Sequence, residues 1–210
     1  IFDRYIFFQI HHRKVIGHKV QVSGAEISVF RSLCILRSNG NDEGFRLTKK
    51  TGTEYEYTVA DNVPAPGRRN RLRTRLDALG LLGLKAPEKF VPDAVRGWNN
   101  RSVAAYIRGV FDTDGGVATS NTDSMPFLRL GMTAPDVVNG VAALLAERFV
   151  IYGQVCRGNT IGREITAIPG KVYCAKHDVY SFTIADRQSV LRFAALVGFA
   201  AVVKQEKLMS

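Results

Sequence analysis

The most constraining stretch of the sequence covers residues 106–117, an apolar segment that ends in two aspartates and two glycines. Before and within it, Val103, Ile107 and Val110 recur at intervals of three and four residues. That spacing predicts an α-helix with one buried face. The helix therefore carries Asp114 to its C-terminal end, beside whatever packs against the helix.

Both ends of this helix have recognisable signals. Asn100 or Ser102 is expected to cap its start, because either side chain can accept a hydrogen bond from a free N–H group of the first turn. Gly115 and Gly116 are expected to end it with a positive φ, which glycine adopts without a steric penalty. Asp112 points away from Asp114 on a helix, so we expect it to be a cap or a structural acid.

Residues 112–115 are open to two other interpretations. They form a C-terminal turn without further function, or they begin a calcium-binding loop. The calcium loop requires a liganding side chain, a glycine and a glutamate at fixed positions. Counted from Asp112, those positions hold Gly116, Val117 and Asp123. The calcium loop is therefore excluded, and the simple turn remains open.

The overall charge points to the class of partner. The chain has 29 Lys and Arg against 19 Asp and Glu, a net charge of +10. Such an excess is typical of a protein that binds nucleic acid; the alternatives are a basic, well-hydrated surface without such a partner, or a basic structural protein.

No apolar run has the length of a membrane span, so no membrane partner is expected. Three cysteines without a CxxC pair favour reduced thiols and a cytoplasmic, organellar or nucleoid-associated location.

The chain also contains an internal repeat. Residues 55–61 and 180–186 share four identities in seven positions, and each segment is followed by an arginine- and leucine-bearing helical pattern that ends in Gly80 or Gly198. Lysine-bearing segments follow in turn, beginning at Lys85 and at Lys204. Three matches in the same order indicate a duplication, with halves at residues 1–95 and 96–210.

Periodicity predicts the elements of each half. In the first half we expect two strands within residues 1–24 joined by a basic turn at 13–17, a helix over 25–38, a hairpin of 45–50 and 54–60 around a turn at 51–53, and a helix over 68–82. In the second half we expect strands over 116–120 and 127–133 around a turn at 121–124, a helix over 136–152 that stops at Gly153, a hairpin of 154–166 and 172–184, and a helix over 187–199.

The motif segment resembles the LAGLIDADG motif of homing endonucleases, most closely the form found in inteins. Residues 107–115 match its nine-residue core as Ile-Arg-Gly-Val-Phe-Asp-Thr-Asp-Gly. Arg108 stands where the family name has alanine. Ala105 and Gly109 form a small strip of the kind on which two such helices pack in the family. Residues 89–92, Lys-Phe-Val-Pro, are also similar to a stretch that precedes the second motif helix in inteins.

The resemblance implies the fold class. We expect an α+β protein of two tandem αββαββα half-domains, whose paired sheets form a pseudo-two-fold saddle over DNA. The offset between Lys85 and Lys204 is 119 residues, which places the first motif aspartate about five positions before Ile1. The first half is therefore expected to lack its first helix.

The resemblance also implies site residues. By position Asp114 would bind a divalent metal, Mg²⁺ or Mn²⁺, and Lys204 and Lys85 would reach the phosphate and the active-site waters. Every second side chain of a strand points to the same face of its sheet, so the basic and polar side chains on a DNA-facing strand face are the candidates for DNA binding. They are Arg13, Lys14, His18, Lys19, Arg46, Lys49, Lys50, Arg129, Arg157, Arg163, Lys171 and Lys176.

The expected function is that of a site-specific, metal-dependent double-strand DNA endonuclease of the homing type. It would act as a monomer on a long, near-palindromic site, with a homodimer as the other possibility. The alternative is a non-cleaving nucleic-acid binder on the same fold: a transcription regulator, an RNA maturase or a decayed endonuclease. Asp114 favours the nuclease, whereas the missing helix favours the binder, since one carboxylate leaves half of a metal site unbuilt.

Overall fold

A computed structural model describes residues 15–16, 19–23, 45–49, 56–61, 71–119, 125–168 and 171–210. The predicted helix over residues 25–38 and the predicted turns at 51–53 and 121–124 lie outside these ranges.

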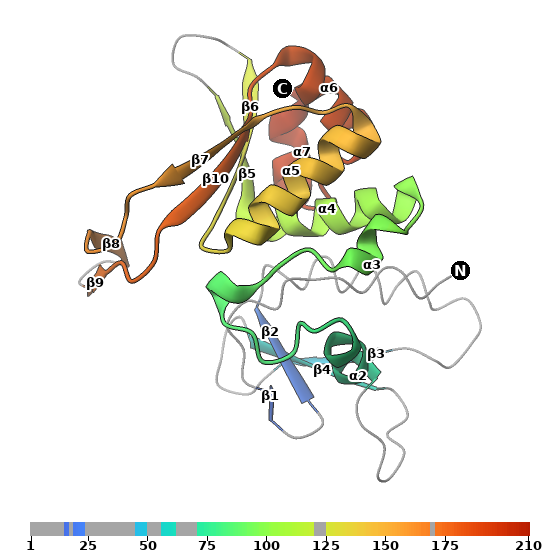
Figure 1. Ribbon diagram of the computed structural model, residues 1–210, viewed down its shortest axis with the longest axis vertical. Helices are drawn as coiled ribbons and strands as arrows, with labels where there is room; N and C mark the ends of the chain where they lie inside the picture. Colours follow the sequence, from blue (N-terminus) through green and yellow to red (C-terminus); the bar gives the residue numbers. More distant parts are fainter. Residues whose placement is uncertain are drawn as a thin grey trace.

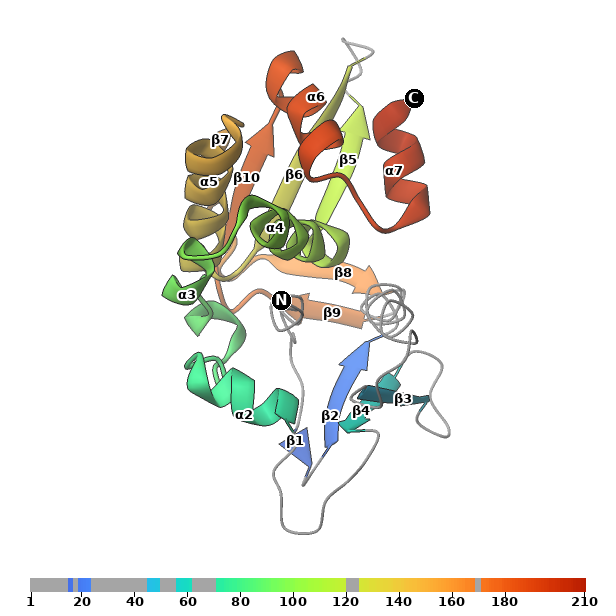
Figure 2. The same cartoon turned by 90° about the vertical axis from the view of Figure 1, so that its right-hand side faces the viewer.

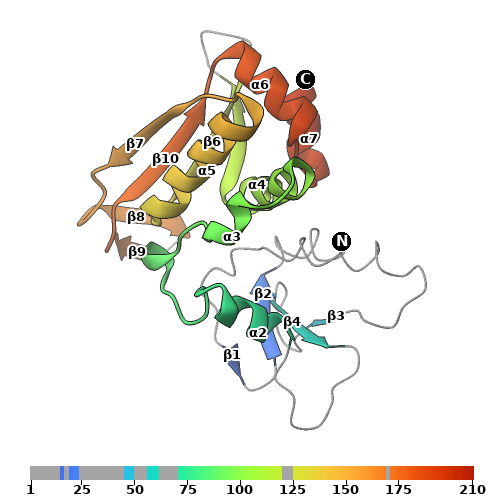
Figure 3. The same ribbon diagram turned by 45° about the vertical axis from the view of Figure 1, so that its right-hand side comes forward.

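The second half forms one antiparallel sheet covered by helices (Figures 1 and 3). Its strands lie in the order β5-β6-β10-β7, and the element order confirms the expected α-β-β-α-β-β-α pattern with additions. The elements are α4 (Asn100–Asp114), β5 (Gly115–Thr119), β6 (Pro126–Met132), α5 (Pro135–Phe149), β7 (Gln154–Gly158), β8 (Glu164–Ile168), β9 (Lys171–Cys174), β10 (Val179–Ile184), α6 (Arg187–Leu196) and α7 (Val202–Met209).

Alternation along the strands separates the two faces of this sheet. On β6, Leu128 and Leu130 are buried while Arg129 between them is exposed. Phe182 of β10 pairs with Leu130, so it lies on the same face as the buried leucines. The four helices share one apolar core with that face, which includes Phe111 of α4. The described helices thus gather on one side of the sheet, as Figure 2 shows.

Helix α4 begins one residue earlier than either predicted cap. Asn99 is the N-cap, and its Oδ1 accepts a hydrogen bond from the N–H of Ser102 at 2.9 Å. The expectation that Asn100 or Ser102 caps the helix was therefore wrong, since the residue before Asn100 is the cap. The reason is that Ser102 is itself buried and supplies the N–H that needs a partner.

The end of α4 corrects the expected role of its glycines. Gly115 has φ −96° and ψ 170°, an extended conformation rather than a left-handed one. A Cβ on Gly115 would meet Cδ1 of Phe111 at 2.6 Å and its Cα and carbonyl oxygen at 2.8 Å. Glycine is therefore required here by close packing and not by φ, and the chain passes directly from α4 into β5.

The end of α5 also differs from the prediction. The helix ends at Phe149 instead of reaching Gly153, because Val150 adopts φ 55° and ψ 43°. The N–H of Ile151 then bonds to the carbonyl of Leu145 at 3.1 Å, the usual way to satisfy an open carbonyl at a helix end. Gly153 serves a different purpose, because a Cβ there would collide with Thr183 and Phe182 of β10.

Replacing Val150 by glycine is expected to raise the free energy of unfolding by about 1 kcal/mol. A left-handed residue with a Cβ costs about 1–2 kcal/mol, of which glycine's greater flexibility in the unfolded chain cancels part. Thermal unfolding followed by circular dichroism measures the change. Val203→Gly is the control, since Val203 is 78% exposed in the helix α7 and should lose stability. A Val150→Gly protein that unfolds as readily as Val203→Gly would contradict the strain.

The long hairpin predicted over residues 154–184 divides into two parts. β7 pairs with β10 up to Gly158 and Val179, and β8 pairs with β9 from Glu164 and Cys174 onward. Figure 1 shows β8 and β9 continuing past the ends of β7 and β10. We call residues 159–177 the arm.

Strands of the first half pair as predicted, with one correction. β3 (Phe45–Lys49) pairs with β4 (Glu56–Asp61), and β1 (Val15–Ile16) pairs with β2 (Lys19–Ser23). Val15 and Ile16, which the sequence placed in the turn expected at 13–17, are paired strand residues, so that turn was wrong at these two positions; its other residues lie outside the described ranges. The sheet order is β1-β2-β4-β3, the same succession of first, second, fourth and third strands as in the second half.

The repeat also recurs in the helices after the fourth strands. α2 (Arg71–Ala78) follows β4 and is shorter than the predicted 68–82. Gly80 after α2 and Gly198 after α6 both have positive φ, 68° and 62°. The two glycines that marked the repeat in the sequence thus both follow a helix end and both adopt a left-handed backbone conformation. The tandem LAGLIDADG arrangement as a whole stays a prediction.

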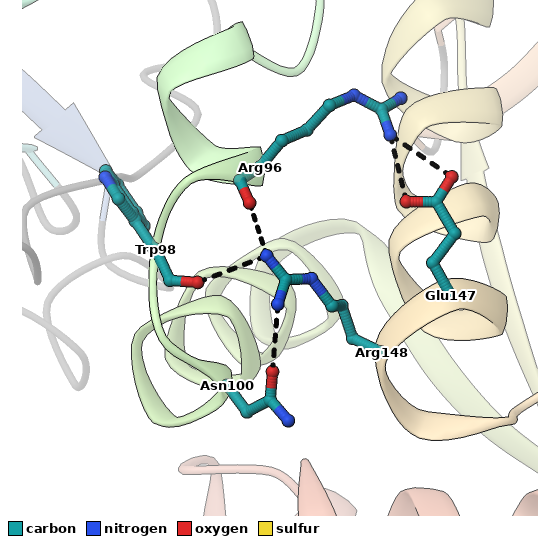
Figure 4. Close-up of polar contacts among 5 residues, drawn as sticks. All are labelled: Arg96, Trp98, Asn100, Glu147 and Arg148. Atoms are coloured by element: carbon teal, nitrogen blue, oxygen red, sulfur yellow. Dashed lines mark hydrogen bonds and ion pairs between the residues drawn. The ribbon is translucent and has the colours of Figure 1, made fainter.

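The connection between the halves is fastened to α5. It contains the 3-10 helix η1 (Ala86–Glu88) and α3 (Asp93–Arg96). In Figure 4, Arg148 of α5 donates to the carbonyl oxygens of Arg96 and Trp98 and to Oδ1 of Asn100, while Arg96 forms an ion pair with Glu147. These contacts satisfy carbonyls at the end of α3 and set the start of α4.

Candidate functional site

The C-terminal end of α4 meets the segment that leads into α7. There the carboxylate of Asp112 accepts hydrogen bonds from the N–H groups of Ala200, at 3.1 Å, and of Ala201, at 3.2 Å. Asp112 is only 5% exposed. Its carboxylate therefore satisfies N–H groups at the start of α7, and the expectation that Asp112 is a cap or structural acid is confirmed.

Lys204 of α7 makes the reciprocal contact. Its ammonium donates to the carbonyl oxygens of Phe111 at 3.0 Å, Asp112 at 2.7 Å and Gly115 at 2.6 Å. Phe111 and Asp112 belong to the last turn of α4, and Gly115 caps it at the start of β5. A helix end leaves carbonyl oxygens without partners, and the helix dipole favours a positive charge there. The three N–H bonds of the ammonium are all used in this way.

Burial shifts the titration of both groups. Removal from water is the main cause that raises the pKa of Asp112 above its ordinary value, against the hydrogen bonds from Ala201 and Ala200 and the charges of Lys204 and Arg108. Burial likewise lowers the pKa of Lys204, against the attraction of Asp112 and Asp114. Asp112 and Lys204 are therefore two partly desolvated charges that bind backbone groups of each other's segments and so join α7 to α4.

Asp114 lies at the same helix end but in a more open position. It is half-buried, and Oγ1 of Thr113 lies 2.8 Å from its Oδ2. The charge of Asp114 acts on Lys204, so the lysine suggested by the repeat does lie near the motif aspartate. In the part of the chain that the structure describes, no three His, Cys, Asp or Glu side chains come together as a metal site.

Lys85, the counterpart of Lys204 by the repeat, has a different environment. It is exposed and precedes η1, and its N–H donates to Oε2 of Glu88 at 2.8 Å. The two lysines thus differ in burial, and the structure describes no metal-binding cluster around Lys85. Their catalytic roles stay predictions.

The face of the second sheet opposite the helices presents a row of side chains across its strands. Gln154 of β7 pairs with Thr183 of β10, Thr183 with Arg129 of β6, and Arg129 with Gly116 of β5. Gln154 and Arg129 are exposed and Thr183 is half-buried. This row, which we call the open-face row, ends two residues after Asp114. It offers hydrogen-bond donors and acceptors and one positive charge.

The other predicted DNA-binding residues are distributed as follows. Arg13, Lys14, His18 and Lys50 lie outside the described residues; Lys19 lies in β2, Arg46 and Lys49 in β3, Arg157 in β7, Lys171 in β9, and Arg163 and Lys176 in the connections of the arm. Arg163 and Lys176 are exposed.

Arg157 lies on the other face of the sheet from Arg129. Its partner in β10 is Tyr180, whose own partner in β6 is Met132 at the edge of the core. The guanidinium forms an ion pair with Asp178, Nη2 to Oδ2 at 2.6 Å, and lies 6.0 Å from the Tyr180 ring. Arg157 therefore binds within the fold, on the face where the helices pack.

Much of the positive charge of the second half is used in the same way. Several of its arginines donate to backbone carbonyls or carboxylates of the fold: Arg96, Arg108, Arg148, Arg157 and Arg192. The net charge therefore overstates what this half offers to phosphate groups. The exposed cations among its predicted DNA-binding residues include Arg129, Arg163 and Lys176.

Sequence reasoning missed Asp178 and the reciprocal backbone contacts that Asp112 and Lys204 make between α4 and the segment leading into α7. Asp178 is 7% exposed although the two residues before it, Lys176 and His177, are exposed and polar. Its partners are 17 to 21 residues away, and those of Lys204 are 89 to 93 residues away. No local pattern records such contacts, so only the fold reveals them.

Comparisons with known proteins agree with the motif and the fold. Residues 101–198 match the family model described as LAGLIDADG-like domain. The chain is similar to the crystal structure of "full-length DUF199/WhiA from Thermatoga maritima", with a TM-score of 0.50 and 10% identity over 99% of this chain and 58% of that one. It is also similar to the N-terminal LAGLIDADG domain of DUF199/WhiA, with a TM-score of 0.47 and 10% identity over 94% and 80% of the two chains.

These likenesses concern the fold. The chain spans 58% of the full-length WhiA structure, and at 10% identity the likeness shows the fold alone. No curated protein matches the sequence. Among the described residues, no helix is both long and apolar enough to cross a membrane.

Proposed function

Because residues 101–198 form a LAGLIDADG-like domain, we propose that this chain binds double-stranded DNA without cleaving it. The proposed binding surface is the face of the second sheet opposite its described helices, including the open-face row. The row places an arginine among neutral side chains that donate and accept hydrogen bonds, the combination that proteins use on phosphates and base edges.

The observation that carries the non-cleaving half of this proposal is the position of Lys204. A lysine that assists phosphodiester hydrolysis must reach water or phosphate, yet this ammonium donates to three backbone carbonyls, those of Phe111 and Asp112 in α4 and of Gly115 directly after it. Asp112 is similarly occupied by α7. The end of the motif helix thus holds α4 and α7 together, and Asp114 lies half-buried beside this contact.

The form of the target follows from the two sheets. They share one strand order, so tandem halves would offer two related surfaces. We accordingly propose a long DNA target of approximate two-fold symmetry, bound by a single copy of the chain. The mass of the protein–DNA complex tests this, since a complex with two copies of the chain would show a homodimer instead.

A metal-dependent endonuclease is the second candidate, favoured by the open position of Asp114. Mg²⁺ or Mn²⁺ binds through one or two carboxylates and phosphate oxygens, and Asp114 supplies one carboxylate. The described residues add no cluster of further ligands around it, so they do not complete a site for the ion.

Asp114→Asn distinguishes the two functions. For a binder, we expect the dissociation constant for a duplex DNA library to change by less than about threefold, because one half-exposed charge contributes less than about 1 kcal/mol. Fluorescence polarisation measures binding, and gel electrophoresis with Mg²⁺ or Mn²⁺ detects cuts.

Each outcome decides between functions. Metal-dependent cuts that disappear in Asp114→Asn would establish the nuclease and refute the proposal. Binding that is stronger to single-stranded RNA than to duplex DNA would refute DNA as the partner. A wild-type protein that binds neither would refute nucleic-acid binding altogether.

A further inference from the structure

A buried carboxylate lies at the joint between the second sheet and the arm. Asp178 precedes β10, at the point where pairing of β7 with β10 ends and pairing of β8 with β9 has not begun. Its side chain is 6% exposed. Two of its hydrogen-bond donors are backbone N–H groups of the arm, Thr160 at 3.0 Å and Ile161 at 3.3 Å to Oδ1.

The other oxygen of Asp178 is held by the sheet. Nε of Arg157 donates to Oδ2 at 2.8 Å, and Nη2 of the same guanidinium lies at 2.6 Å. The hydrogen bond from Arg157 is the main cause that lowers the pKa of Asp178, so the carboxylate is charged at neutral pH. One carboxylate thus connects β7 to the first residues of the arm.

Further hydrogen bonds close the joint from the other strand. Oγ1 of Thr160 donates to the carbonyl of His177 at 2.9 Å and accepts from the N–H of Val179 at 3.1 Å. Arg163 and Ala175 are also joined, N–H of Ala175 to the carbonyl of Arg163 at 2.9 Å. The two connections between sheet and arm are therefore fixed to each other, which sets the direction in which the arm leaves the sheet.

The arm itself has the features of a surface that contacts nucleic acid. Arg163 and Lys176 are exposed, and Lys171 lies in β9, against a single acid, Glu164. Its form is a two-stranded ribbon, which fits the major groove of B-DNA. In Figure 2 the ribbon runs across the direction of the sheet strands, and in Figure 1 it lies on the other side of the sheet from helices α4–α7.

We propose that Asp178 is a positioning residue for DNA binding, which holds the arm at a fixed angle so that Arg163 and Lys176 reach phosphates beside the open face. This inference rests on the proposed function. The physical reason is that an arm already held in its bound orientation loses little conformational entropy on binding, whereas a freely moving arm loses more and contributes less affinity.

Asp178→Ala tests the inference because two effects have opposite signs. Removing a carboxylate and freeing Arg157 adds positive charge, so electrostatics alone predicts tighter DNA binding and a steeper dependence of the binding constant on salt. Loss of positioning instead predicts weaker binding and a shallower dependence on salt. Each phosphate contact contributes about 0.9 to the slope of log K against log salt. We therefore expect Asp178→Ala to reduce the slope toward that of Arg163→Ala/Lys176→Ala, which loses about 1.8.

Asp186→Ala is the matched control. Asp186 caps α6 by accepting from the N–H of Ser189 at 2.8 Å, far along the sheet from the arm, so its removal takes away one carboxylate and a cap. We expect its slope to equal that of the wild type. In addition, Arg163→Ala/Lys176→Ala should have little further effect in the Asp178→Ala background, because the arm is then already unengaged.

The results separate the inference from the function on which it rests. An unchanged or steeper slope in Asp178→Ala, with wild-type DNA binding intact, overturns positioning and leaves DNA binding standing. Absence of DNA binding by the wild type overturns both. If Asp178→Ala is poorly folded, Asp178→Asn repeats the measurement, since its amide keeps one acceptor for Thr160 and Ile161 but loses the charge that pairs with Arg157. A slope shallower than that of the wild type in Asp178→Asn supports positioning, and an unchanged or steeper slope overturns it.

Discussion

Replacing Lys204 by methionine is expected to lower the free energy of unfolding by about 2–3 kcal/mol. Methionine keeps the apolar stem but removes the donor for the carbonyls of Phe111, Asp112 and Gly115. It also takes the charge of Lys204 away from the buried carboxylate of Asp112, on which it acts without direct contact; for a buried ion pair in direct contact, removing one partner costs about 3–5 kcal/mol. We place the effect below that range because Lys204 is only half-buried. Urea unfolding followed by far-UV circular dichroism measures it.

Lys207→Met provides the control on the same helix. Lys207 is exposed, and a surface substitution of this kind changes stability by less than about 0.5 kcal/mol. Adding Asp112→Asn to Lys204→Met should cost less than the sum of the single changes, because the two side chains stabilise the same joint. If Lys204→Met unfolds at the same urea concentration as Lys207→Met, Lys204 does not stabilise the fold, and the result would favour a catalytic role for it.

Replacing Gly115 by alanine is expected to destabilise the protein by about 3 kcal/mol. The added Cβ would lie 2.8 Å from the Cα and the carbonyl oxygen of Phe111. A flexible side chain could move aside, but backbone atoms cannot do so without distorting the last turn of α4, and overpacking of this kind costs about 1–3 kcal/mol. The same distortion would displace the carbonyls that bind Lys204. Thermal unfolding with calorimetry measures the loss.

The neighbouring glycine is a close control. Gly116 has open space where its Cβ would be, and its φ is not positive, so Gly116→Ala should change the free energy of unfolding by less than about 0.5 kcal/mol. A difference between the two variants isolates the contact with Phe111, since residue type, strand and sequence context are shared. Equal stability of the two would mean that the backbone approach at Gly115 is looser than the structure has it.

The sequence by itself determined the regular elements and the position of the motif aspartate. Buried residues at helical spacing predicted α4 because burial of one face is recorded in the local pattern. The repeat between residues 55–61 and 180–186 predicted related strands, and β4 and β10 do occupy the same place in their sheets. The LAGLIDADG-like resemblance, read from residues 107–115, is confirmed by the family match over residues 101–198.

Wrong predictions from the sequence fell where tertiary contacts decide the local structure. Val150 ends α5 in a conformation that its own preferences oppose. Gly115 is required by the backbone of Phe111, not by the conformational freedom for which glycine is usually placed at a helix end.

Only the tertiary structure decided how the charged side chains are used. Lys204 looked free to reach a phosphate, but the fold surrounds its ammonium with the carbonyls of α4. Arg157 looked like a reader on a DNA-facing strand, but the register puts it on the opposite face, paired with Asp178. Helices and strands follow from periodicities between near neighbours, whereas the partner of a charge depends on which distant segments the fold brings within hydrogen-bonding distance.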